Sequence, residues 1–136
     1  MNHWKNNYEL SQRFYFEAAH TLNRSYDAVG SNRIHGHTYE AEITINGTPD
    51  ANTGMIVDIA QFRMEIERIR QLLDHQFLDD VADLGPATLE SLSYFIFKKI
   101  QPALPNIVSV MVERKVSGDR CVFRRVAQVE SSEDVF

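Results

Sequence analysis

The sequence of 136 residues is poor in cysteine, in basic residues and in long apolar runs. Its single cysteine, Cys121, cannot form an internal disulfide, so neither a disulfide framework nor a cysteine-rich zinc finger is expected. There are 14 basic residues against 19 acidic ones, and the formal net charge of -5 argues against nucleic acid or an anionic membrane as a partner. A small anionic substrate remains compatible, because a few cations in a cleft can outweigh that charge.

No stretch approaches the length of a membrane span, and the polar first ten residues, MNHWKNNYEL, lack the apolar core of a signal peptide. With the lone cysteine, these absences predict a cytoplasmic protein. The sequence shows no internal repeat and no low-complexity segment, and 43% hydrophobic residues at this length suffice for one core. We therefore expect a single domain over residues 1–136, with its core at about 8–127 and a frayed acidic tail at 128–136.

Two early segments alternate in the manner of strands with one buried face. In the first, which begins at Tyr8, one face carries Phe14, Phe16, Ala18 and His20. In the second, residues 37–45, it carries His37, Tyr39, Ala41, Ile43 and Ile45. The polar residues 21–34 between them predict a long loop, and loops of that length are functional or disordered.

Two helical stripes follow the strands. Asp58 is placed to cap the first helix, whose apolar positions are Ile59, Phe62, Ile66, Ile69 and Leu73. The second helix is expected to begin at Thr88 and to stop before Pro102, with a stripe of Leu89, Leu92, Ile96 and Ile100. Stripes of this kind are typical of core packing rather than of cofactor contact.

The last part of the chain predicts a hairpin. Residues 107–115 are rich in β-branched side chains, and a turn at residues 117–119 leads into a final strand through Val122 and Val126. The element order is therefore ββααββ. This order predicts an α+β domain in which two helices cover one face of a four-stranded antiparallel sheet.

Three histidines fall where the two early strands meet. His35 and His37 are two residues apart, so an extended backbone directs both rings to one side. His20 ends the first strand, and antiparallel pairing across the loop would place it beside them. Three neutral imidazoles with an open fourth position form the usual ligand set of a catalytic zinc. The alternative is a chance His-x-His, although Gly36 between the two rings allows a ligand to approach closely.

Asp74 and His75 follow the first helix and have two interpretations. The helix dipole and the neighbouring carboxylate favour the charged form of a histidine at this position, and such a pair can transfer protons near neutral pH. The same two residues could instead be a C-capping histidine and a solvated aspartate.

Glu113 ends an otherwise apolar segment, on the same face as Ser109 and Met111. A buried carboxylate there would need a cationic or multiply donating partner. At the surface, Glu113 could instead pair with Arg114 or Arg124.

Seven short motifs occur in order between about Phe14 and Arg124. They are FEAAH at residues 16–20, HGH at 35–37, TGMIVD at 53–58, LDHQFLDD at 73–80, TLE at 88–90, VMVE at 110–113 and CVFR at 121–124. In this order and spacing the chain resembles the family of 6-pyruvoyltetrahydropterin and 6-carboxytetrahydropterin synthases. The likeness is strongest to its short bacterial branch, which serves queuosine synthesis.

The resemblance implies a fold, an assembly and a set of functional residues. The fold is the tunnelling fold, whose subunits form trimers that close a barrel and usually assemble as hexamers, with active sites between subunits. The implied ligands of Zn²⁺ are His20, His35 and His37. The implied proton relay includes Asp74 and His75. The implied substrate-binding residues are Glu113, which would hold the amino-pyrimidine edge of the pterin, and Thr88 and Glu90.

The implied reaction is the zinc-dependent conversion of 7,8-dihydroneopterin triphosphate to 6-carboxytetrahydropterin, with loss of triphosphate and acetaldehyde. Zinc would chelate the side-chain hydroxyls and acidify the adjacent C–H and O–H groups. Arg24, Arg33 and Lys115 are candidates for contact with the triphosphate. A pyruvoyl-forming synthase and an aldolase-like variant are the alternative activities.

Ser31 departs from the family pattern, which has a proton-abstracting cysteine four residues before the first histidine of HGH. A serine hydroxyl ionises far less readily than a thiol and needs stronger activation by a base. Cys121, in the predicted last strand, matches a structural cysteine and is no obvious substitute. Either Ser31 or His75 takes over the proton transfer, or the chain is a zinc- and pterin-binding protein without turnover.

Overall fold

A computed structural model describes residues 7–126 of the chain. The strands are β1 (Tyr8–His20), β2 (His35–Gly47), β3 (Ile107–Arg114) and β4 (Asp119–Arg124). The helices are α1 (Ala28–Asn32), α2 (Ile59–Leu73), the 3₁₀ helix η1 (Leu78–Asp80) and α3 (Leu89–Ile100). The predicted tail at 128–136 lies outside the described residues. Among those that are described, no helix has the length and apolarity needed to cross a lipid bilayer.

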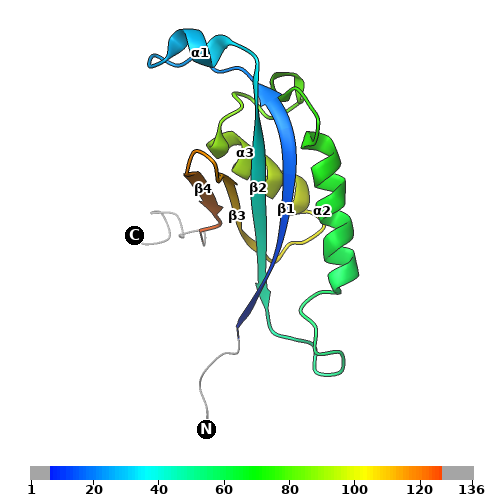
Figure 1. The fold of residues 1–136 in the computed structure, drawn as a ribbon. Coiled ribbons are helices and arrows are strands. Elements are labelled where there is room, and N and C mark those ends of the chain that lie inside the picture. Colours follow the sequence, from blue (N-terminus) through cyan, green and yellow to red (C-terminus); the bar gives the residue numbers. More distant parts are fainter. Residues whose placement is uncertain (1–6, 127–136) are drawn as a thin grey trace, which may run out of the picture.

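The four strands form one antiparallel sheet in the order β1-β2-β3-β4. The two longer helices lie on the same face, α2 against β1 and α3 against β3 and β4 (Figure 1). The short helix α1 lies beyond the end of β1 and β2, apart from this layer (Figure 1). The predicted α+β architecture and the order ββααββ are thus confirmed.

The buried face of the sheet follows the predicted alternation. Both helices begin at the predicted caps, since the Asp58 side chain accepts a hydrogen bond from the Ala60 N–H (2.8 Å) and the Thr88 hydroxyl accepts one from the Ser91 N–H (3.1 Å). The core residues with no exposed surface include Phe16, Ala41, Ile43, Phe62, Ile69, Leu73, Leu92, Ile96 and Ile100. Each large apolar side chain buried in this way contributes about 1.5–3 kcal/mol to folding.

Three segments differ from the sequence-based expectation. The final strand, expected to run through Val126, ends at Arg124, where its pairing with β3 also ends. The predicted loop at residues 21–34 contains α1, because the Ser31 N–H donates to the Asp27 carbonyl (2.9 Å) and the Leu22 N–H donates to the Ser31 carbonyl (2.7 Å). A helix of five residues is too short to show a periodic pattern. The second strand begins at His35 rather than at 37, because His35 pairs with His20 and closes the β1–β2 ladder.

Candidate metal centre and active site

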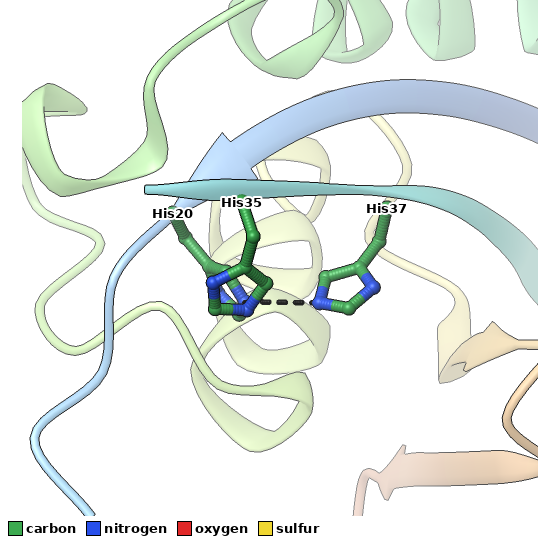
Figure 2. A group of neighbouring side chains, drawn as sticks. All are labelled: His20, His35 and His37. Carbon is green, nitrogen blue, oxygen red and sulfur yellow. Dashed lines mark hydrogen bonds between the residues drawn. The ribbon is translucent and has the colours of Figure 1, made fainter. Parts of the chain in front are cut away.

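The three histidines converge at the end of the β1–β2 ladder. His20 is the cross-strand partner of His35, and His37 is the partner of Ala18, so all three rings project from the same face (Figure 2). The Nε2 atom of His20 lies 2.9 Å from Nε2 of His35 and 3.1 Å from Nε2 of His37. The sequence-based expectation that these imidazoles meet is therefore correct.

Backbone carbonyls orient two of the rings. The Nδ1–H of His20 donates to the Ala87 carbonyl (2.8 Å), and the Nδ1–H of His35 donates to the Arg33 carbonyl (2.7 Å). A ring that donates from Nδ1 in its neutral form presents the lone pair of Nε2. The lone pairs of His20 and His35 therefore face each other, and a cation placed between them would remove that repulsion.

The surroundings of His20 and His37 favour the neutral imidazole, which is the form that binds a metal. Burial lowers the pKa of His20, which is 1% exposed, and its hydrogen bond to Ala87 only partly offsets the effect. Burial and the adjacent Arg114 guanidinium lower the pKa of His37 to about 4.

The donor set fits a tetrahedral metal ion. Bonds of about 2.0–2.1 Å to imidazole nitrogens would place tetrahedral ligands roughly 3.3 Å apart. The two Nε2 spacings from His20, 2.9 Å to His35 and 3.1 Å to His37, lie within a few tenths of an ångström of that value. The three potential ligand atoms, from His20, His35 and His37, lie within 4.8 Å of one another. The fourth position is left to a water molecule or a substrate oxygen.

A cavity of about 330 Å³ lies beside the histidines. Its lining includes Ser31, His35, His37, Arg24, Arg114 and Asp119. Ser31 is 3% exposed, and its hydroxyl donates to the Ala28 carbonyl (3.1 Å) while accepting from the Arg24 N–H (3.3 Å). The structure thus brings Ser31 to the cavity of the histidines, although its proton is directed to a carbonyl.

The Asp74–His75 pair lies elsewhere. Asp74 accepts from the Glu17 N–H (2.9 Å), and its other oxygen lies 2.9 Å from Nδ1 of His75. His75 takes a positive φ of 58°, and its N–H donates to the Glu17 carbonyl (2.6 Å). It lines a second cavity, of about 540 Å³, together with Glu17, Gly36, His37 and Thr38. Its lining includes residues of both sheet faces, because Glu17 and Thr38 alternate with Ala18 and His37.

Asp74 is held as a carboxylate. Its hydrogen bonds from the Glu17 N–H and from His75 hold the pKa of Asp74 below its usual range. The Arg70 guanidinium, 3.1 Å from Asp74 Oδ2, acts in the same direction. The pair is therefore an ordered hydrogen-bonded unit at the C-terminal end of α2, where Asp74 is the capping residue.

Glu113 also points to the face without helices, as its alternation with Ser109 and Met111 predicts. Its cross-strand partner is Glu40, and the guanidinium that approaches it belongs to Arg13, at 3.9 Å. Neither of the two surface partners considered for Glu113 forms an ion pair with it in the described part of the chain. Arg114 alternates to the opposite face of β3, and Arg124 lies opposite Ser109, four residues before Glu113.

The remaining candidates fall in three places. Thr88 caps α3 and follows Ala87, whose carbonyl holds His20, while Glu90 is exposed in the first turn of the helix. Arg24 lines the cavity of the histidines and pairs with Asp27 at 3.4 Å. Lys115 pairs instead with Glu40 at 2.7 Å, on the face without helices.

Arg114 is the site residue that the sequence reasoning missed. Its Nη1 atom lies 3.2 Å from Nε2 of His37, and its side chain lines the same cavity. The signal was present in the alternation of β3, which places Arg114 with Val110 and Val112 on the face that carries the histidines.

Comparison with known proteins agrees with this geometry. A sequence model of the family described as 6-pyruvoyl tetrahydropterin synthase matches residues 9–126. The chain belongs to this family. The resemblance seen in the motifs is thereby confirmed, and with it a tetrahydropterin synthase type of function.

Relatives in the family carry two different product names. The chain is 30% identical to the 6-carboxy-5,6,7,8-tetrahydropterin synthase of Synechocystis, over 76% of the chain and 83% of the relative. It is 32% identical to the human 6-pyruvoyl tetrahydrobiopterin synthase, over 79% and 83%. In structure it matches the Caenorhabditis elegans 6-pyruvoyl tetrahydropterin synthase with a TM-score of 0.78 at 20% identity, covering 89% of this chain and 97% of that one.

Proposed function

We propose that the protein is a zinc-dependent lyase that converts 7,8-dihydroneopterin triphosphate to 6-carboxytetrahydropterin, the queuosine-pathway reaction, in the cytoplasm. The observation that carries the proposal is the convergence of His20, His35 and His37, with two of their outer nitrogens held by backbone carbonyls. The 6-carboxy names of the relatives from Synechocystis and Bacillus subtilis, the latter 28% identical, support this product.

Each candidate residue has a definite task in this proposal. The bound ion supplies Lewis acidity toward the oxygens of the substrate side chain. His75, held by Asp74, takes up and returns protons, and Ser31 assists beside the metal site. Glu113 accepts the paired N–H groups of the pterin ring. Thr88 and Glu90, at the start of α3, complete the substrate-binding set.

The separation of these groups supports an active site shared between subunits. Ser31, His35 and His37 line one cavity, whereas His75 lines another, to which His37 also contributes, and Glu113 points to the face without helices. We infer that a second copy of the chain completes the site in a homotrimer or hexamer. The sheet leaves its edge strands β1 and β4 with one neighbour each, which suits pairing with another copy.

Two observations favour other outcomes. The human relative is named for a 6-pyruvoyl product, and the metal ligands serve both products equally. Ser31, in the position of the expected cysteine, favours a zinc- and pterin-binding protein without turnover, since its hydroxyl ionises far less readily than a thiol.

The test is incubation of the zinc-loaded protein with 7,8-dihydroneopterin triphosphate, with products followed by mass spectrometry. We expect acetaldehyde together with 6-carboxytetrahydropterin. A pyruvoyl product would assign the chain to the other activity, and tight binding without any product would support the binding protein.

Ser31→Cys and Glu113→Ala then separate the causes of a low rate. If only the base is missing, Ser31→Cys restores turnover. If Ser31→Cys changes nothing while Glu113→Ala abolishes turnover, the idea of a missing base is wrong.

A further inference from the structure

Arg114 occupies an unusual place for a cation, beside the metal ligands. It ends β3 on the face that carries the histidines, and its side chain is 22% exposed. Nη1 lies 3.2 Å from Nε2 of His37, while Nη2 donates to Asp119 Oδ2 at 2.8 Å. Its buried Nε–H has no hydrogen-bond partner within the part of the chain that the structure describes. A buried donor without a partner is costly, and a ligand can remove that cost.

The turn after β3 holds this guanidinium in place. The hydroxyl of Ser117 donates to the same Asp119 carboxylate oxygen that accepts from Arg114, at 2.9 Å. Gly118 takes a φ of 81°, which closes the turn between the two strands. Arg114 is therefore positioned in advance, in contrast to a freely rotating surface arginine.

Metal binding changes what Arg114 can contact. An N–H of Arg114 and a metal ion compete for the same lone pair, that of His37 Nε2. When the metal takes this lone pair, Nη1 loses its acceptor, and a guanidinium has only donors to offer. Nη1 then requires a new acceptor close to the metal.

The charge of the loaded cavity favours an anionic acceptor. Among its lining residues, the guanidinium groups of Arg24 and Arg114 are balanced by the carboxylates of Asp27 and Asp119. A divalent metal therefore leaves an excess of two positive charges. Arginine binds phosphoryl oxygens well, because its planar fork can donate two hydrogen bonds to them.

We propose that Arg114 binds a phosphoryl group of the substrate beside the metal and thereby selects phosphorylated pterins over unphosphorylated ones. This inference rests on the proposed function, since it takes the substrate to be a pterin phosphate. It adds a specificity-determining residue to the site.

The experiment compares binding of neopterin and neopterin triphosphate to the zinc-loaded protein by pterin fluorescence. We expect the triphosphate to bind more tightly, and Arg114→Gln to reduce the ratio of the two affinities by about 10- to 100-fold, as for the loss of a charged hydrogen bond. Arg114→Lys, which keeps the charge without the fork, should retain part of the ratio. Arg63→Gln removes an equal charge from an exposed position on α2 and should leave the ratio unchanged.

Three results would overturn the inference. In the first, the wild-type protein binds the two ligands with equal affinity. In the second, Arg114→Gln leaves both affinities unchanged. In the third, Arg114→Gln lowers both affinities by the same factor, so that their ratio is unchanged. The last result would show that Arg114 only supports the local structure. Inorganic triphosphate, added as a competitor, should displace neopterin triphosphate from the wild type, and failure to do so also contradicts a phosphoryl contact.

The binding ratio and the turnover assay fail independently. If the wild type forms no tetrahydropterin product, while Arg114→Gln reduces the ratio of the two affinities, the proposed activity is wrong and the proposed role of Arg114 stands. If the wild type forms the product, while Arg114→Gln leaves the ratio of affinities unchanged, the proposed activity stands and the proposed role of Arg114 is wrong.

Discussion

The histidine cluster at the end of β1 and β2 and the Asp74–His75 pair at the end of α2 both contact β1 but differ in their surroundings. His20 is 1% exposed, and its Nε2 atom lies 2.9 Å from Nε2 of His35 and 3.1 Å from Nε2 of His37, which line a cavity together with Ser31. The side chain of His75 is 77% exposed and lines a different cavity. One region therefore has the three histidines proposed as metal ligands, with their supporting hydrogen bonds, within a single chain. The other presents the hydrogen-bonded Asp74–His75 pair, proposed for proton transfer, to a cavity.

This difference indicates that a single chain can form the proposed metal site without a second subunit. A metal site needs lone pairs brought within a few ångströms, and the β1–β2 register achieves this locally. A proton relay has to reach a substrate, and the open cavity beside His75 is where a second subunit can bring one. Binding of metal and transfer of protons should consequently respond to different substitutions.

The largest expected effect is that of His35→Ala. Removal of one of three ligands should abolish stoichiometric zinc binding and reduce product formation to background, because two imidazoles cannot hold the ion in place. Elemental analysis of the purified variant measures the metal content. Full retention of zinc in His35→Ala would contradict the assignment of the metal site.

His75→Ala should lower turnover by about 10²–10⁴-fold, the usual contribution of a general acid or base, without loss of zinc. The combined measurement of rate and metal content separates it from His35→Ala. Loss of zinc in this variant would mean that the two regions are not separate units.

Mixing of the two inactive variants sharpens the comparison further. If sites form between subunits, mixed oligomers of His35→Ala and His75→Ala contain some sites with both functions intact, roughly a quarter for random assembly. We therefore expect activity to reappear after joint refolding. Continued inactivity of verified mixed oligomers would place both groups of one site in the same chain.

Arg70→Gln should have a smaller effect on the relay alone. Arg70 lies 3.1 Å from Asp74 and donates from Nε to the Tyr15 carbonyl at 2.9 Å. Loss of this partly exposed ion pair should raise the pKa of Asp74 and reduce turnover about two- to fivefold. Arg63→Gln on the same helix is the control, and an equal loss in both variants would indicate a general charge effect.

The smallest effect concerns the metal-free protein as a function of pH. Burial and Arg114 lower the pKa of His37 from 6.5 to about 4, so the unfolded chain binds more protons between these values. The free energy of unfolding should therefore fall as the pH is lowered from 6.5 to 4. Urea titrations at several pH values measure this free energy. The variant His37→Asn should show a smaller decrease between pH 6.5 and 4. An equally large decrease in His37→Asn would assign the pH dependence to other groups.

Much of the fold could be predicted from local patterns. Alternation located the buried faces of β1 and β2, and the Asp58 and Thr88 caps marked both helix starts. The short helix α1 could not be predicted, because it depends on hydrogen bonds between Ser31 and residues earlier in the loop. Its five residues carry too few positions to show a periodic pattern.

The sequence by itself determined the α+β class, the meeting of the three histidines and the family, since these follow from periodicity, spacing and the order of motifs. Only the tertiary structure decided that His75 faces a separate cavity and that Arg114, rather than Glu113, lies beside the metal ligands. The physical reason is that strand alternation decides which face a side chain occupies, while its partners come from strands and turns that are distant in the chain.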